Sequence, residues 1–187
     1  MIMRGLWMLA RGQRDGMKEF SATSESLTAS LAPLIAFPLV WQGMTALQGA
    51  WRSALIAFLV QLCAALTLPL VTYEMARLFQ RQPLWLRAAT ALNWSFWIGA
   101  AVSILAIILA GGLAQAGTPP GLALTGILGL AGGYLLWNRW FIVRAGLALG
   151  GWQAVLVTLL TLLASGACTG LAILLGYGPG SLHLASL

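Results

Sequence analysis

Five long, uncharged apolar runs constrain the fold of this chain more than any other feature. A helix needs about 20 mostly apolar residues to cross the hydrocarbon core of a bilayer. Lipid offers no partners to backbone N–H and C=O groups, so only helices and closed barrels span it. A barrel would show segments of about ten residues that alternate polar and apolar side chains, whereas these runs are continuous. The sequence therefore predicts an all-α fold, a polytopic transmembrane helix bundle of about five spans. The runs are residues 27–47, 53–73, 90–113, 121–138 and 152–175.

The composition agrees with a chain that lies in a lipid bilayer. Hydrophobic residues make up 60% of the 187 residues and charged residues only 7%, whereas about a quarter of a soluble domain is charged. So few polar side chains could not cover the surface of a monomer in water. The runs and their short connections leave no room for a separate soluble domain, so residues 27–175 are predicted to form one membrane domain.

The basic residues predict the orientation of the chain. With five spans, nine of the ten Lys and Arg residues fall on one side of the bilayer and only Arg52 falls on the other. Basic residues favour the cytoplasmic side, so the N-terminus is predicted to be cytoplasmic and the short tail of residues 176–187 periplasmic. Lys18 is the single lysine, and Ala, Leu and Gly are abundant. This composition indicates a GC-rich bacterial genome and hence a bacterial inner membrane.

Residues 1–26 are predicted to be a cytoplasmic amphipathic segment. At helical spacing, residues 2–20 place all of their charged side chains except Arg14 within one arc, opposite the apolar side chains. A helix of this kind lies flat in the headgroup region of a bilayer. Thr23 or Ser24 is expected to be the N-cap of the first span.

Two groups of residues near the predicted cytoplasmic ends of the spans are candidate contacts for lipid headgroups or for a partner protein. Basic side chains at this level attract anionic headgroups, and tryptophan favours the boundary between lipid and water. The first group lies between the second and third runs, and the second begins at the end of the fourth run. They comprise Arg77, Arg81 and Arg87, and then Trp137, Arg139, Trp140 and Arg144.

Glycine pairs at a spacing of four indicate helix packing. Small residues at this spacing let two helix backbones approach closely. The spacing occurs in the fourth run at Gly129 and Gly133 and in the fifth run at Gly166 and Gly170. Tight packing is predicted at these positions, either within the chain or against another protein.

Few side chains could carry chemistry within the membrane. All charged residues lie outside the apolar runs or at their edges, which argues against proton pumps and ion-coupled transporters because their relays need titrating groups at depth. The polar residues inside the runs include Gln42, Gln61, Asn93 and Ser165. The amides of Gln42 and Gln61 are candidate pore linings, and ordinary interhelical hydrogen bonds are the alternative interpretation.

Cofactor, metal and nucleotide motifs are absent from the sequence. No phosphate-binding loop, zinc-protease or serine-hydrolase pattern occurs. Cys63 and Cys168 fall inside apolar runs and are interpreted as small buried hydrophobes, and His183 has no neighbouring ligands for a metal. We expect no cofactor and no enzymatic activity. The net charge of +6 is attributed to membrane topology rather than to nucleic-acid binding.

The overall plan resembles that of the Yip1-type membrane proteins. The shared features are a cytoplasmic amphipathic start, five spans, an outside C-terminus and a similar length. The segment Ala32-Pro33-Leu34-Ile35-Ala36 in the first run is similar to the apolar Ala-Pro start of some bacterial members. The Asp-Leu-Tyr-Gly-Pro type motif of eukaryotic members is missing. The resemblance implies a five-span fold, and it carries over no trafficking role, no GTPase binding and no functional residue.

Three functions are compatible with these features. The favoured hypothesis is a non-catalytic accessory subunit or organiser of a membrane complex, in contact with lipids and with other membrane subunits or copies of itself. It rests on the lack of buried charge, on the small-residue faces and on the amphipathic N-terminal helix. The alternative is a channel or transporter for a small solute, formed as an oligomer. An enzyme that acts on lipids through Glu74 and the neighbouring arginines is the third hypothesis.

An odd number of spans puts the two ends of the chain on opposite sides of the membrane. Alkaline phosphatase fused after Leu187 is expected to be active, because it needs the disulfides that form in the periplasm, and a fluorescent protein fused there is expected to be dark. Fusions after Gln80, in a predicted cytoplasmic connection, should give the opposite pair of results. A fluorescent C-terminal fusion without phosphatase activity would contradict the five-span topology.

Overall fold

Residues 2–174 are described by the computed structural model, and all of their regular structure is helical. No strand occurs among them, so the predicted all-α class is confirmed. The predicted tail of residues 176–187, which includes His183, and the last residue of the fifth predicted span lie outside the described part. The elements are α1 (Ile2–Ala10), the 3-10 helix η1 (Arg14–Glu19), α2 (Ser24–Leu47), α3 (Trp51–Leu78), α4 (Gln82–Trp94), α5 (Phe96–Gln115), α6 (Pro120–Gly146) and α7 (Gly151–Leu174).

Five helical stretches of the described chain are long and apolar enough to cross a membrane: α2, α3, α4 with α5, α6, and α7. The chain is therefore a multi-pass membrane protein. The largest extensions beyond the predicted runs are in α4, which begins at Gln82 rather than at residue 90, and in α6, which continues past residue 138 to Gly146. Arginine ends an apolar run but is a good helix former, so a helix can continue beyond the end of the apolar run.

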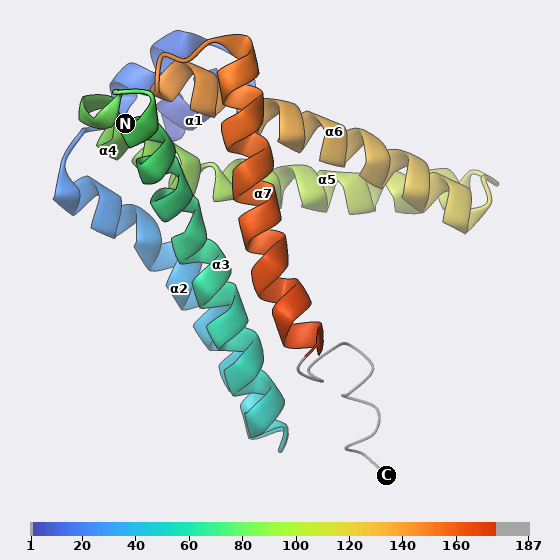
Figure 1. Ribbon diagram of the computed structural model, residues 1–187. Helices are drawn as coiled ribbons and strands as arrows, with labels where there is room; N and C mark the ends of the chain where they lie inside the picture. The colour runs from blue at the N-terminus through green and yellow to red at the C-terminus, as the bar shows by residue number, and fades with distance from the viewer. Residues whose placement is uncertain (1, 175–187) are drawn as a thin grey trace.

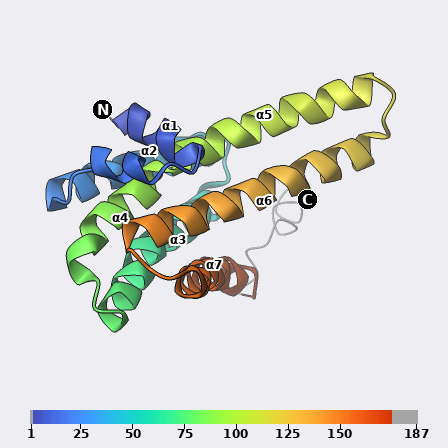
Figure 2. The same cartoon turned by 90° about the horizontal axis from the view of Figure 1, so that it is seen from above.

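The helices form two arms that diverge from one junction (Figure 1). Helices α2, α3 and α7 run together as the three-helix arm, whereas α5 and the first part of α6 form a two-helix arm that projects away from it (Figures 1 and 2). The junction consists of α1, η1 and α4 with the adjoining ends of α3, α6 and α7. Beyond its base, the two-helix arm is held mainly by the contact between its own two helices.

Helix α4 lies at the centre of the junction, and its small side chains allow the surrounding helices to pack closely. Ala88, Ala89 and Ala91 are fully buried, and α4 packs against α2, α3 and α6. Small residues of this kind let backbones approach closely. The tightest approach is to α6, where a Cβ added to Gly146 would lie 2.8 Å from the Cβ of Ala88.

The start of α2 follows the predicted capping pattern. The Thr23 hydroxyl oxygen accepts a hydrogen bond from the Ser26 backbone N–H at 3.2 Å, so Thr23 rather than Ser24 is the N-cap. Glu25 lies in the first turn, where a negative charge favours the positive end of the helix dipole.

The prediction of one continuous helix over residues 2–20 is wrong. The chain turns at Gly12, which has a φ of 74°, and η1 follows. Glycine adopts this backbone conformation readily because it has no Cβ. The two pieces fold onto each other, since a Cβ on Gly5 would lie 2.8 Å from Cε2 of Phe20, and one on Gly16 would lie 2.8 Å from the Gly5 carbonyl oxygen.

The apolar side of this N-terminal segment packs against other helices of the chain. Four of its side chains belong to the same core as residues of α4 and α6. Burial against other helices removes apolar surface from water, as burial in lipid does. The apolar periodicity alone therefore could not distinguish packing against protein from packing against lipid. Trp7 remains exposed on the outer side. The four buried side chains are Leu6, Leu9, Met17 and Phe20.

The contact between α4 and α6 predicts different effects for two glycine substitutions in α6. Gly146→Ala forces a Cβ against Ala88 and is expected to lower the free energy of unfolding by about 1–3 kcal/mol, the usual cost of overpacking. Gly129→Ala is the matched control, because nothing lies within 4 Å of a Cβ added there. Thermal or denaturant unfolding in mild detergent measures both. Equal stability of the two variants would contradict the close approach.

Candidate binding site at the helix junction

A cavity of about 290 Å³, here called the junction cavity, lies beside the junction between the two arms and extends to the middle of α3 and α7. Every one of the five apolar stretches contributes to its wall. Most of the lining side chains are apolar. The polar lining residues are Asn93, Ser95, Asn138, Arg139 and Ser165.

Asn93 joins α4 to α2 beside this cavity. Its side chain is 1% exposed, and its Nδ2 donates a hydrogen bond to the Ser30 hydroxyl oxygen at 2.9 Å. The Ser30 hydroxyl in turn donates to the Leu27 carbonyl at 2.6 Å. The Asn93 Oδ1 is buried and has no hydrogen-bond partner among the described residues. A buried amide oxygen without a hydrogen-bond donor normally lowers the stability of a fold by about 1–3 kcal/mol.

Arg139 places a positive charge at the same cavity. Its Nε is buried and without a hydrogen-bond partner in the described chain, and none of the described acidic side chains forms an ion pair with it. Glu25, which has no ion pair among the described residues, is exposed at the start of α2. The described ion pairs are Arg4–Glu19 at 3.8 Å, Asp15–Lys18 at 2.7 Å and Glu74–Arg77 at 3.5 Å.

Two polar side chains of α6 hold the end of α1. The Tyr134 hydroxyl donates a hydrogen bond to the Ala10 carbonyl at 2.7 Å, and Asn138 Nδ2 donates to the Leu9 carbonyl at 3.0 Å. The last carbonyls of a helix have no partner within the helix. These side chains therefore cap α1 and fix the N-terminal segment over the junction.

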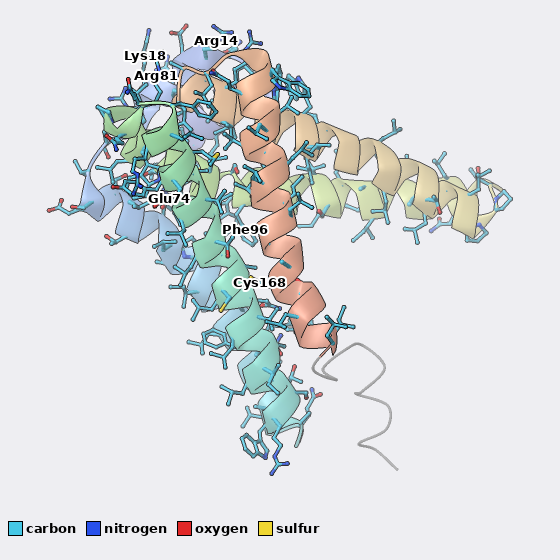
Figure 3. All side chains as sticks on the ribbon, in the orientation of Figure 1. Arg14, Lys18, Glu74, Arg81, Phe96 and Cys168 are labelled. Carbon is cyan, nitrogen blue, oxygen red and sulfur yellow. The ribbon has the colours of Figure 1, made fainter. Side chains whose placement is uncertain are left out.

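The candidate headgroup contacts gather at the junction end of the molecule, where Figure 3 labels Arg14, Lys18 and Arg81. Arg81 is exposed and Arg77 is paired with Glu74. Arg87 has a buried Nε without a partner in the described chain, but it does not line the cavity. Arg52 is separated from this group by the length of α3, since it lies at the start of that helix.

Lys18 and Asp15 form the shortest of the described ion pairs on this surface. The hydrogen bond from Lys18 and the charge of its ammonium group lower the pKa of the Asp15 carboxyl. Both side chains are exposed, so solvent screens the pair. Asp15 is thus paired at the surface and does not neutralise the junction cavity.

Of the two aromatic residues in the second candidate group, Trp140 connects α6 to α7, whereas Trp137 stacks on a residue of its own helix. The ring of Trp137 stacks on Phe141 with centroids 5.8 Å apart. The Trp140 indole N–H donates to the Gly151 carbonyl at 3.0 Å, which ties α6 to α7. The Arg144 guanidinium lies 5.2 Å from the Trp140 ring centroid.

The predicted glycine faces are not used for packing within the described chain. A Cβ added to Gly129, Gly133, Gly166 or Gly170 would meet nothing within 4 Å. Alanines form the buried contacts of the two-helix arm instead. The buried residues of its two helices beyond the junction are Ala106 and Ala110 of α5 and Ala123 of α6. Packing of the glycines against another protein stays a prediction.

The two candidate pore amides do not belong to the junction cavity. Gln61 is exposed on α3, and Gln42 is half-buried on α2. Neither lines the junction cavity or the apolar pockets beside α7. The interpretation of both cysteines as buried is also wrong for Cys63, which is exposed, whereas Cys168 is half-buried; both are free.

Sequence reasoning considered Arg139 only as an interfacial contact and missed its position in a cavity wall. The apolar run ends at Asn138, but no glycine or proline follows until Gly146, and this lack of a helix stop could have shown that α6 continues. Tyr134 and Asn138 are also four residues apart, a spacing that puts both on one helix face. The function of that polar face appears only once α1 is in place.

Compared with known proteins, the chain matches no family model, no curated protein and no solved structure. Within residues 2–174, no three His, Cys, Asp or Glu side chains are grouped closely enough to hold a metal ion.

The cap on α1 predicts the effect of Tyr134→Phe. Loss of the hydroxyl removes the hydrogen bond to the Ala10 carbonyl and is expected to cost about 0.5–1.5 kcal/mol, so the N-terminal segment should open more often. Trypsin should then cleave after Arg11 or Arg14 faster than in the unaltered protein. Tyr73→Phe is the control, since Tyr73 packs edge-on against Trp85 through its ring. Equal cleavage of the two variants would contradict the role of the cap.

Proposed function

We propose that this chain is a non-catalytic accessory subunit of a membrane complex and that its two-helix arm packs against the transmembrane helices of another protein. One observation carries the proposal: α6 has an open glycine face on an arm that the rest of the described chain leaves largely uncovered. The face comprises Gly126, Gly129, Gly132 and Gly133. Nothing lies within 4 Å of a Cβ added at any of these four positions.

A helix of another protein explains this face better than lipid does. Glycine lowers the stability of a helix relative to alanine, and fluid acyl chains can cover a surface of any shape. A second helix gains from glycine, because the two backbones approach closely and more atoms come into van der Waals contact. The arm already uses alanines for its internal contact, so its glycines are free to serve an external one.

The charge pattern supports an apolar transmembrane partner. No charged residue lies between Arg87 and Arg139, so the whole two-helix arm and its connecting loop are uncharged. Such a surface offers no ion pair to a soluble protein. It is complementary to an equally uncharged spanning helix, for which close packing is the main source of affinity.

The proposal places the junction at the cytoplasmic face of a bacterial inner membrane. The basic residues other than Arg52 belong to α1, η1 and the turn between them, to the α3–α4 region or to the end of α6. The excess of basic residues on the cytoplasmic side supports this orientation.

Co-purification from native membranes tests the proposal. The tagged chain, expressed at its natural level and extracted in mild detergent, is expected to bring down one other membrane protein in a constant ratio. Gly129→Leu should reduce the yield of that protein at least about tenfold, since side-chain bulk at a close helix contact costs more than 1.4 kcal/mol. Quantitative mass spectrometry and sizing of the extract measure both results.

Gly43→Leu is the matched control for this experiment. Gly43 lies on α2, and a Cβ added there also meets nothing within 4 Å, so both variants place a leucine on an open helix face. The control should keep the partner. A homogeneous oligomer of this chain alone, or equal loss of the partner in both variants, would contradict the proposal.

A further inference from the structure

We propose that the junction cavity binds the headgroup of an anionic phospholipid, with Arg139 as the counter-ion of its phosphate. The cavity lies where all five apolar stretches meet, so a ligand there contacts both arms. Its volume of about 290 Å³ is near the lower limit of ordinary ligand pockets, which begin at about 300 Å³, and it suits a headgroup rather than a whole lipid.

The charge of Arg139 favours an anionic ligand. This residue lies within α6, one of the helices long and apolar enough to span the membrane, and its Nε is buried without a partner in the described chain. Arg139 lies near the end of that helix, and a guanidinium with a buried nitrogen that has no partner is still costly. No described carboxylate pairs with it, so an anion from outside the chain is the remaining source of neutralisation. A guanidinium binds phosphate through two parallel hydrogen bonds.

Residues in the wall of the same cavity also carry hydrogen-bond acceptors. Asn93 contributes a buried Oδ1 that no described group donates to. Pro38 and Pro69 lie inside α2 and α3, and each lacks the N–H that would bond to the carbonyl four residues earlier. Those carbonyls belong to Leu34 and Ala65, and both residues line the cavity. These groups favour a ligand that carries hydrogen-bond donors as well as an anion.

These requirements together select one class of ligand. A phosphatidylglycerol headgroup has a phosphate with one negative charge and two hydroxyl donors, and it leaves the occupied cavity neutral. Phosphatidylethanolamine also has a phosphate and donors, but its ammonium group leaves the charge of Arg139 uncompensated overall. The remaining wall is mostly apolar, which suits the first part of the acyl chains. Free phosphate would satisfy Arg139 and leave that apolar surface without a partner.

Native mass spectrometry of the delipidated, purified full chain tests the binding. The protein in neutral detergent is titrated with dioleoyl phosphatidylglycerol and, separately, with the ethanolamine lipid of the same chains. We expect phosphatidylglycerol to bind at least about tenfold more tightly, as expected for one uncompensated charge interaction. Equal binding of the two lipids by the unaltered protein would overturn the proposal without any variant.

Two substitutions locate the site. Arg139→Gln should weaken phosphatidylglycerol binding at least about tenfold, whereas Arg81→Gln, at an exposed arginine of the same end of the molecule, should leave it within about twofold. Asn93→Asp tests the cavity without removing the arginine, because the new carboxylate supplies an internal counter-ion and repels phosphate; it should also abolish the preference. Loss of binding in Arg81→Gln alone, or unchanged binding in Asn93→Asp, would overturn the proposal.

Competition separates the two possible sources of the phosphate. If millimolar glycerol 3-phosphate displaces the lipid from the unaltered protein but not from Arg139→Gln, the phosphate chemistry holds and a soluble ester is the source. If glycerol 3-phosphate does not displace the lipid and Arg139→Gln still weakens lipid binding, the lipid itself is the ligand.

Discussion

The close packing of α4 against its neighbours is the constraint on which the rest of the structure depends. Alanines without exposed surface at positions 88, 89 and 91 let α2, α3 and α6 approach one short helix together. A larger side chain on α4 would push these helices apart, because the interior leaves no space for added atoms. This contact sets how the two arms diverge and where the cavity between them lies. It also sets where the N-terminal segment packs.

Polar side chains then fix the helices around α4 in register. Asn93 joins α4 to α2 through Ser30, and the Trp85 indole N–H joins it to α3 through the Pro69 carbonyl at 3.0 Å. Each of these groups would lack a partner in lipid, where unsatisfied polar groups are costly. The hydrogen bonds therefore specify which helices meet, while apolar contacts supply the bulk of the stabilisation. Arg139 departs from this pattern, since the described chain supplies no anion for it.

Sequence reasoning was successful where one helix could be considered by itself. The continuous apolar runs predicted the helical class, and they correspond to the five long apolar stretches of the described chain. It failed where two elements meet. The apolar side of residues 2–20 was assigned to a membrane surface, whereas four of its side chains belong to one core with residues of α4 and α6. Packing of Gly129 against another protein stays a prediction, since nothing in the described chain lies within 4 Å of a Cβ added there. A protein interior and lipid are both apolar, so hydrophobic periodicity identifies an apolar helix face but does not show whether protein or lipid packs against it.

The sequence by itself determined that this chain is helical, where its apolar runs lie and which ends of those runs carry the basic residues. These properties depend on local composition and on the requirement that backbone hydrogen bonds be satisfied within each span. Only the tertiary structure decided that Asn93 and Arg139, far apart in the sequence, line one cavity. It also decided that Gln61 lies on an exposed surface. The rotation and bending of helices about a shared contact settle these placements, because that contact involves residues from several helices at once.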